Sequence, residues 1–220
     1  MPADAVCVTG IFRDDHGGWS YQTVIASAPR PFRVRAVSSE TSEVSWVAAE
    51  DVEALDLHPG FAEQWPVLRP ALQPLAFIVD AANVMGSRPD GWWRDRAGAA
   101  GRLRDQLAVL AAEGVPALPE AMQVPPLERW FPDIVLVVEG AARSIAAAHA
   151  AGSRGTEPAG QPDGRIRVVA APGSGDDTIA ELARDLPGRR LVVTADRQLR
   201  DRCTAAGASV TGPGWLLRQL

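Results

Sequence analysis

Residues 75–87 read Leu75-Ala-Phe-Ile-Val-Asp80-Ala-Ala-Asn83-Val-Met-Gly-Ser, an apolar run that ends in an acid and is followed by turn-forming residues. Such an unbroken apolar run is typical of a strand buried on both faces of a parallel sheet. An acid at its last position lies at the carboxyl edge, where open α/β sheets bind ligands. Asp80 is therefore a candidate functional residue; the alternative is that it only caps the following turn.

The composition describes a globular chain without a membrane-spanning segment. Of the 220 residues 46% are apolar, yet no apolar run approaches the roughly 20 residues that span a bilayer. The start of the chain lacks a basic segment followed by an apolar one, so we expect no signal peptide. Cys7 and Cys203 lie far apart without metal-ligand spacing, which favours free thiols in a reducing compartment. We therefore expect a cytoplasmic protein with no membrane partner.

The charge is unevenly distributed. Residues 1–70 hold 10 acids and 5 arginines, whereas residues 71–220 hold 17 of each, so the net charge of −5 belongs to the first part. The second part is neutral overall, and electrostatics alone neither demands nor excludes a polyanionic substrate there.

The first part of the chain predicts a small β-rich unit. Residues 4–12, 19–28 and 43–47 alternate as strands do, and residues 50–57 and 61–68 read as short helices. Arg69-Pro-Ala-Leu-Gln-Pro74 is the best boundary, because its two prolines favour a stiff, extended linker. We therefore divide the chain into residues 1–70 and residues 75–220.

The second part alternates strands with helices. After the first strand, apolar runs predict strands at residues 133–140, 166–170, 191–194 and 208–210, and helical patterns fill residues 94–113, 141–151, 176–186 and 196–206. This alternation predicts an α/β fold in three layers, with helices on both faces of a mostly parallel sheet.

Several acids share one predicted placement. Asp80, Glu139 and Asp196 each end or directly follow a strand, and Asp176 and Asp177 open a helix just after another strand. Parallel strands present their carboxyl ends along one edge, so these acids converge there and repel one another if all are ionised. A bound Mg²⁺ or Mn²⁺ ion relieves that repulsion, and oxygen ligands favour these ions. The alternative is that each acid only caps a helix.

The motifs around these acids resemble a known nuclease family. Phe-Ile-Val-Asp80-Ala-Ala-Asn83-Val, Ser174-Gly-Asp-Asp-Thr-Ile-Ala-Glu, and Val-Val-Thr194-Ala-Asp-Arg-Gln-Leu-Arg are similar to the NYN branch of the PIN-like nucleases over residues 75–212. The closest likeness is to bacterial ribonucleases with Asp-Gly-Tyr-Asn on the first strand. Here Ala81-Ala82 replaces Gly-Tyr, so the aromatic contact of that motif is absent, and Trp92 or Trp93 is the substitute we consider.

The resemblance implies a PIN-like, metal-dependent enzyme that cuts phosphodiesters, with RNA as the expected partner. Asp80, Asp176 or Asp177, and Asp196 would hold one or two ions, with Glu139 as a further ligand or base. Asn83 would orient a water or a phosphate. The expected substrate contacts are Thr194, Arg197 and Trp93, whose ring could stack on a base. The sequence does not decide between Asp176 and Asp177, which point about 100° apart on a helix.

The first part resembles the second half of a Nudix hydrolase domain. The matching segments are Asp14-Asp-His-Gly-Gly-Trp-Ser-Tyr21, Glu40-Thr-Ser-Glu-Val-Ser-Trp-Val47 and Leu57-His-Pro-Gly-Phe61. The family's metal-binding motif, Arg-Glu-x-x-Glu-Glu, does not occur in this sequence. Residues 1–70 are therefore expected to form a partial, β-rich α+β fragment without the catalytic residues of that family.

Three functions remain open from the sequence. The first is a ribonuclease domain behind a Nudix-derived fragment. The second is a Nudix-type nucleotide pyrophosphohydrolase, truncated or degenerate, with the second part as a non-catalytic accessory domain. The third is an acidic edge that binds metal, nucleotide or protein without turnover.

Overall fold

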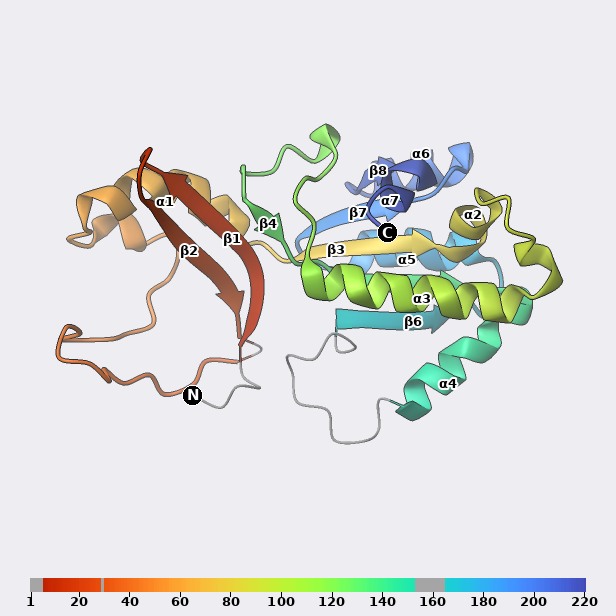
Figure 1. Cartoon of the computed structure of the whole chain (residues 1–220), viewed down its shortest axis with the longest axis horizontal. Helices are drawn as coiled ribbons and strands as arrows, with labels where there is room; N and C mark the ends of the chain where they lie inside the picture. The colour runs from red at the N-terminus through yellow and green to blue at the C-terminus, as the bar shows by residue number, and fades with distance from the viewer. Residues whose placement is uncertain (1–5, 29, 153–164) are drawn as a thin grey trace.

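The computed structural model describes residues 6–28, 30–152 and 165–220 (Figure 1). The strands are β1 (Cys7–Asp15), β2 (Ser20–Ser27), β3 (Leu75–Asp80), β4 (Arg129–Trp130), β5 (Asp133–Val138), β6 (Ile166–Ala170), β7 (Arg189–Val193) and β8 (Ser209–Thr211). The α-helices are α1 (Pro59–Ala71), α2 (Ala81–Gly86), α3 (Arg96–Glu113), α4 (Ser144–Gly152), α5 (Gly175–Asp185), α6 (Arg197–Ala205) and α7 (Pro213–Leu217). Short 3-10 turns cover Val52–Ala54, Trp92–Arg94, Glu120–Met122 and Gly140–Arg143.

A five-stranded sheet forms the larger part of the molecule, and all its strand pairs are parallel. The strand order is β6-β5-β3-β7-β8. After β3 the chain adds β5 and β6 on one side of it, and then β7 and β8 on the other side. At such a reversal the loops after neighbouring strands diverge and leave a crevice at the carboxyl edge. The predicted α/β class with a mostly parallel sheet is confirmed, and the reversal of strand order lies between β3 and β7.

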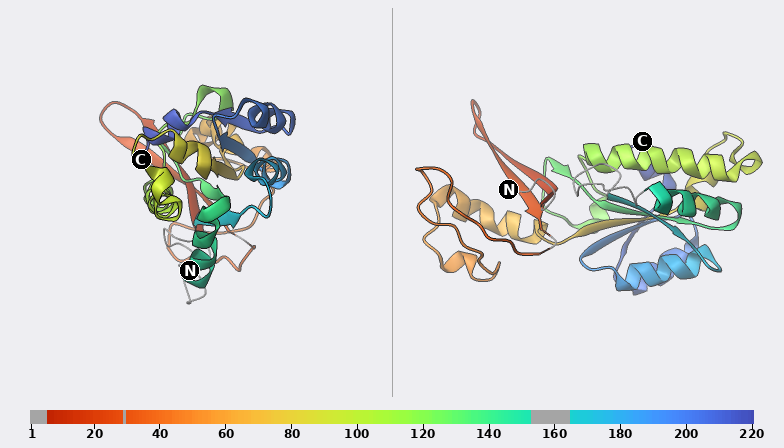
Figure 2. Two further views of the ribbon diagram at one scale, coloured as in Figure 1. Left: turned by 90° about the vertical axis from the view of Figure 1, so that its right-hand side faces the viewer. Right: turned by 90° about the horizontal axis from the view of Figure 1, so that it is seen from below.

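Helices cover both faces of this sheet, as Figure 2 shows in its right-hand view. On one face Phe77 and Val79 pack with buried residues of α2, α3, α4 and α7. On the other face Ile78 packs with buried residues of α5 and α6, among them Ile179 and Leu199. Every residue of β3 is buried, which explains its unbroken apolar run. Within the described ranges no helix is long and apolar enough to cross a membrane.

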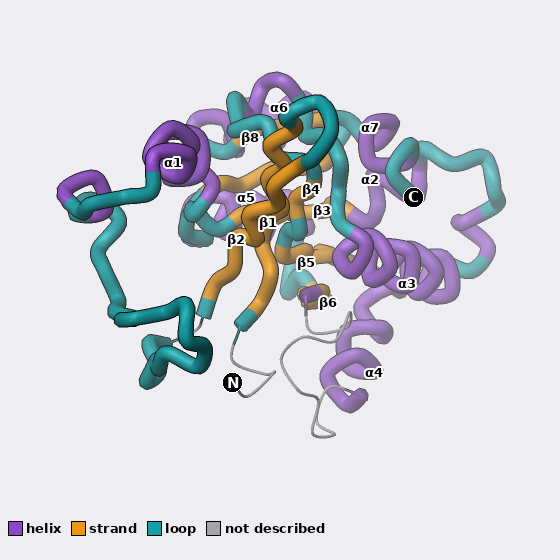
Figure 3. The backbone as a smooth tube through the Cα atoms, turned by 60° about the vertical axis from the view of Figure 1, so that its left-hand side comes forward, coloured by secondary structure: helices purple, strands orange, loops and turns teal. Residues whose placement is uncertain are grey.

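A separate antiparallel sheet of order β2-β1-β4 contains the predicted β-rich part of the chain (Figure 3). Its third strand, β4, lies in the sequence just before β5 of the parallel sheet. The Phe131 amide donates a hydrogen bond to the Thr9 carbonyl at 3.0 Å, and the Arg165 guanidinium donates to the carbonyls of Val8 and Phe131. The N-terminal hairpin is thus hydrogen-bonded to residues from the second part of the chain.

Three local predictions for the first part are wrong. Residues 43–47 form no strand, because their backbone has no partner strand; the Trp46 side chain instead donates to the Phe32 carbonyl at 2.8 Å. Residues 50–57 contain only one 3-10 turn. The predicted extended linker is helical through Ala71, because buried Leu68 and Ala71 continue the packed face of α1 past Pro70. Residues 4 and 5 of the first predicted strand lie outside the described residues.

Both cysteines are free, as the sequence predicted. Cys203 is fully buried in α6, and this burial raises the pKa of its thiol to about 11. A thiol of so high a pKa carries little of the reactive thiolate at neutral pH, so Cys203 is a packing residue.

Candidate active site at the carboxyl edge of the parallel sheet

Asp80 is the last residue of β3 and the N-cap of α2, and only 5% of it is exposed. Its Oδ1 accepts a hydrogen bond from the Asn83 amide nitrogen at 3.0 Å, which is the cap. Its Oδ2 accepts two more, from Asn83 Nδ2 at 2.6 Å and from Thr194 Oγ1 at 2.9 Å. A helix cap needs only the first of these bonds. The other two fix the orientation of the carboxylate.

Thr194 connects Asp80 to the next acid along the edge. It follows β7, is fully buried, and donates to Asp80 while its oxygen accepts from the Asp196 amide nitrogen at 3.2 Å. Its side chain does not reach solvent in this structure, and the expected substrate contact of Thr194 stays a prediction. Its hydroxyl holds the ends of β3 and β7 together.

Asn83 has a similar bridging position. Its side-chain amide nitrogen donates to Asp80, and its Oδ1 accepts from the Ala195 amide nitrogen at 3.3 Å. Both ends of the side chain therefore form hydrogen bonds, one to the end of β3 and one to the segment after β7. The structure shows Asn83 as a residue that positions Asp80, and its expected role in orienting a water or a phosphate stays a prediction.

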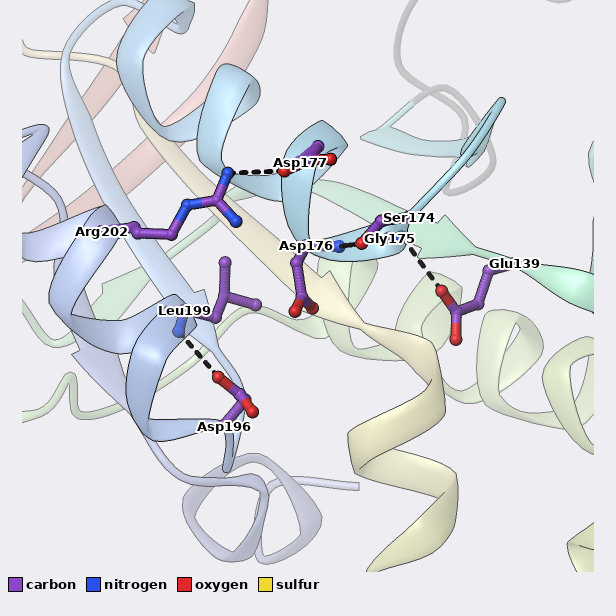
Figure 4. Close-up of polar contacts among 8 residues, drawn as sticks. All are labelled: Glu139, Ser174, Gly175, Asp176, Asp177, Asp196, Leu199 and Arg202. Atoms are coloured by element: carbon purple, nitrogen blue, oxygen red, sulfur yellow. Dashed lines mark hydrogen bonds and ion pairs between the residues drawn. The ribbon is translucent and has the colours of Figure 1, made fainter.

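The two adjacent acids at the start of α5 point in different directions (Figure 4). Asp177 is exposed and forms an ion pair with Arg202 of α6 at 2.7 Å. The Asp176 carboxylate turns away from Arg202, and no hydrogen bond to it is found in the described part of the chain. We therefore assign Asp176, and not Asp177, to the acidic edge.

Asp196 and Glu139 complete the edge. Asp196 is the N-cap of α6 and accepts a hydrogen bond from the Leu199 amide nitrogen at 2.7 Å through Oδ1. Glu139 follows β5 and accepts from the Gly175 amide nitrogen at 3.0 Å through Oε2, which holds the start of α5 against β5. The capping that the alternative interpretation predicted is thus present for Asp80 and Asp196. For α5 the N-cap is Ser174.

Burial and neighbouring charges raise the pKa of two of these acids. Burial raises the pKa of Asp176 above its ordinary value, and the nearby charges of Asp196, Asp80 and Glu139 raise it further, while Arg202 lowers it. Burial also raises the pKa of Asp80, against the lowering effect of its three hydrogen bonds. Acids from separate elements therefore share one electrostatic environment with too little positive charge.

Replacing Asp176 by asparagine is expected to stabilise the metal-free protein at pH 7. A carboxyl whose pKa is raised by folding binds its proton more tightly in the folded state. Stability therefore falls as the pH rises from about 4, the unfolded pKa of aspartate, through the folded pKa. The asparagine side chain of this variant cannot ionise, so the gain in Tm over the wild type should be present at pH 7 and vanish near pH 4.

Thermal unfolding of both proteins in EDTA at the two pH values measures this gain. Asp177→Asn is the matched control, because it removes an acid that is paired with Arg202 and should bring no gain. Equal Tm values for the wild type and Asp176→Asn at pH 7 would contradict the raised pKa of Asp176.

The oxygens left open along the edge suit a hard divalent cation. A carboxylate oxygen accepts about two hydrogen bonds, so Oδ2 of Asp80 is filled and its Oδ1 retains one lone pair. Oδ2 of Asp196 and both oxygens of Asp176 accept no hydrogen bond from the described residues. Among those residues, however, no three His, Cys, Asp or Glu side chains are close enough to enclose an ion. The site fits an open Mg²⁺ or Mn²⁺ site, with one or two carboxylates and water.

The remaining predicted contacts are exposed on the surface. Trp93 is 57% exposed in the turn after α2, whereas Trp92 is partly buried against the core with Arg96 over its ring. Arg197, the first residue of α6, is exposed. Sequence reasoning missed Arg202, which neutralises Asp177, and Arg200, which lies one turn beyond Arg197. Both arginines lie on the same predicted helix as Arg197, three and five residues after it, and this spacing could have drawn attention to them.

Comparisons with known proteins find relatives for part of the chain. No family model matches it. It is 44% identical over 64 residues to a Mycobacterium tuberculosis protein that carries the name putative 8-oxo-dGTP diphosphatase 3, over 28% of this chain and 29% of that protein. It is 35% identical over 71 residues to a Bifidobacterium longum nucleoside triphosphate pyrophosphatase/Nudix hydrolase fusion protein, over 31% of this chain and 15% of that protein.

The chain thus spans less than a third of the length of the curated relatives it matches. These relatives support the predicted Nudix resemblance at this partial coverage. Among solved structures the chain is similar to Rae1 (YacP) from Bacillus subtilis, with a TM-score of 0.41 and 15% identity over 66% of this chain and 72% of that one.

Proposed function

We propose that residues 75–220 form a metal-dependent ribonuclease of the PIN/NYN type. One observation supports this most directly: the Asp176 carboxylate has no hydrogen-bond partner among the described residues, and Asp196, Asp80 and Glu139 raise its pKa. Acids from four elements lie along the carboxyl edge of a parallel sheet, where such folds bind ligands. If these acids served only as helix caps, nothing would require the Asp176 carboxylate to point toward the other acids.

The ion would be held by one or two of three groups, Asp176, Asp196 and Oδ1 of Asp80, with waters as its other ligands. Bound here, a divalent ion would supply an activated water and would stabilise the oxygen that leaves the phosphorus. Thr194 and Asn83 orient the Asp80 carboxylate, and the hydrogen bonds that they donate to it act to lower its pKa against the effect of burial. Glu139 keeps the start of α5, and with it Asp176, against the edge.

The test is cleavage of a labelled single-stranded RNA across metals, comparing the wild type with an Asp80→Asn/Asp196→Asn double variant. We expect cleavage by the wild type with Mn²⁺ or Mg²⁺, none in EDTA, and none above background by the double variant. If purified wild type never cleaves faster than the double variant in any metal, the proposal is wrong.

A second candidate function rests on the partial Nudix-like relatives. The hairpin turn and the start of α1 enclose a cavity of about 380 Å³ in the segments that carry the Nudix resemblance. Its lining includes Asp14, Trp19, Tyr21, Phe61 and Glu63. The alternative is therefore a nucleotide pyrophosphohydrolase whose metal-binding motif is not part of this sequence.

Two measurements separate the candidates. Hydrolysis of 8-oxo-dGTP that persists in the Asp80→Asn/Asp196→Asn variant would favour the Nudix-type function, since those residues belong to the other site. Translation of the gene upstream of Met1 would show whether an in-frame Arg-Glu-x-x-Glu-Glu motif precedes the chain.

A further inference from the structure

A second cavity opens beside the acidic edge, between α6 and β8. Its volume is about 380 Å³. It is lined by Ala195, Arg197, Arg200, Asp201, Thr204 and Val210. Ala195 and Arg197 are the two neighbours of Asp196 in the sequence, so the cavity begins where the acidic edge ends.

The helix geometry of α6 explains why two arginines line this cavity. Residues three, four and seven positions apart share one face of a helix, so Arg197, Arg200 and Thr204 form one stripe. Leu199 and Cys203 occupy the opposite stripe and are fully buried against the sheet. The packing of α6 therefore turns both guanidinium groups outward into the cavity.

These two guanidinium groups have no partner in the described part of the chain, where neither forms an ion pair or donates a hydrogen bond. Arg190 and Arg202 differ: the first donates to four backbone carbonyls, and the second is paired with Asp177. With Asp201 on the same wall, the cavity carries a formal charge of about +1. The two arginines can donate hydrogen bonds to a bound anion, whereas the Asp201 carboxylate repels it.

We propose that this cavity binds a backbone phosphate of the polynucleotide strand, next to the phosphodiester at the acidic edge. An arginine donates to a phosphate through two parallel N–H groups, and Arg197 and Arg200 present two such forks. The inference rests on the proposed nuclease function. It adds Arg200 as a substrate-binding residue and predicts that the bound polynucleotide runs from Asp196 along α6.

The experiment measures binding separately from cleavage. A fluorescein-labelled 12-nucleotide oligouridylate is titrated with the full chain in EDTA, by anisotropy, over a series of NaCl concentrations. Arg200→Ala should weaken binding roughly tenfold at low salt. It should also make the slope of log K against log salt shallower by about 0.7, the value for one single-strand phosphate contact. Asp201→Asn should tighten binding, because it removes the opposing charge.

The matched control is Arg102→Ala, which removes an exposed arginine of α3 on the opposite face of the sheet that has no ion-pair partner among the described residues. It should leave both the affinity and the slope near the wild-type values. The Asp201→Asn variant keeps the test valid if Arg200→Ala folds poorly, because its expected effect has the opposite sign.

The two proposals fail in different ways. If Arg200→Ala binds like Arg102→Ala, and Asp201→Asn does not tighten binding, the phosphate site is wrong, even if the wild type cleaves RNA with Mn²⁺. If the slope depends on Arg200 but no metal supports cleavage, the phosphate site stands and the nuclease function is wrong.

Discussion

Asp176→Asn should reduce metal-dependent RNA cleavage by more than about a hundredfold, whereas Asp177→Asn should leave it within a few-fold of the wild type. Loss of a group that only supports a metal ligand typically costs about 10- to 100-fold. Asp176 is assigned as a direct ligand, so its loss should cost more. Asp177 is already neutralised by Arg202 and points away from the edge.

The measurement is the single-turnover cleavage rate with Mn²⁺ for both variants, at matched protein concentration and at a pH where both are folded. Since Asp176→Asn is expected to stabilise the metal-free protein, its loss of activity would not come from unfolding. A larger loss for Asp177→Asn than for Asp176→Asn would reverse our assignment of the two acids.

Thr194→Val should lower both stability and activity, although valine has nearly the shape of threonine. The variant leaves Asp80 Oδ2 without one donor and the Asp196 amide nitrogen without its acceptor. Leaving a buried donor or acceptor unpaired lowers the free energy of unfolding by about 1–3 kcal/mol. For a chain of this size each kcal/mol lowers Tm by about 2–4 °C. We expect cleavage to fall by roughly 10- to 100-fold, as for other groups that orient a ligand.

Thr194→Ser is the control, because serine keeps the hydroxyl and removes only a methyl group. It should retain most of the activity and lose less stability than Thr194→Val. Thermal unfolding and cleavage of both variants measure the two effects. Equal activity of Thr194→Val and the wild type would show that the hydroxyl does not support the site.

The sequence predicted the parallel sheet because burial on two faces favours an unbroken run of apolar residues, as in β3. It also predicted the acidic edge, since the topology of parallel strands gathers their carboxyl ends. The choice between Asp176 and Asp177 could not be predicted, because it depends on how Ile179 and Ala183 rotate α5 on the sheet. The burial of Thr194 likewise depends on how closely β3 and β7 approach beyond their last hydrogen bonds.

The first part of the chain shows a different reason for failure. Residues 43–47 alternate as a strand should, but a strand also needs a partner, which the local pattern does not specify. The two-residue strand β4 is too short to give any pattern. The hydrogen bonds that join the hairpin to the second part of the chain therefore could not be predicted from the sequence pattern.

The pairing of β1 with β4 has a consequence for anyone who divides this gene. A cut between Ala71 and Leu75 looks natural in the linear sequence, but it separates Gly10 and Ile11 from their strand neighbours Arg129 and Trp130. Each piece would then expose an unsatisfied strand edge, which invites aggregation. The two halves should be produced together, or recombined, before either is judged inactive.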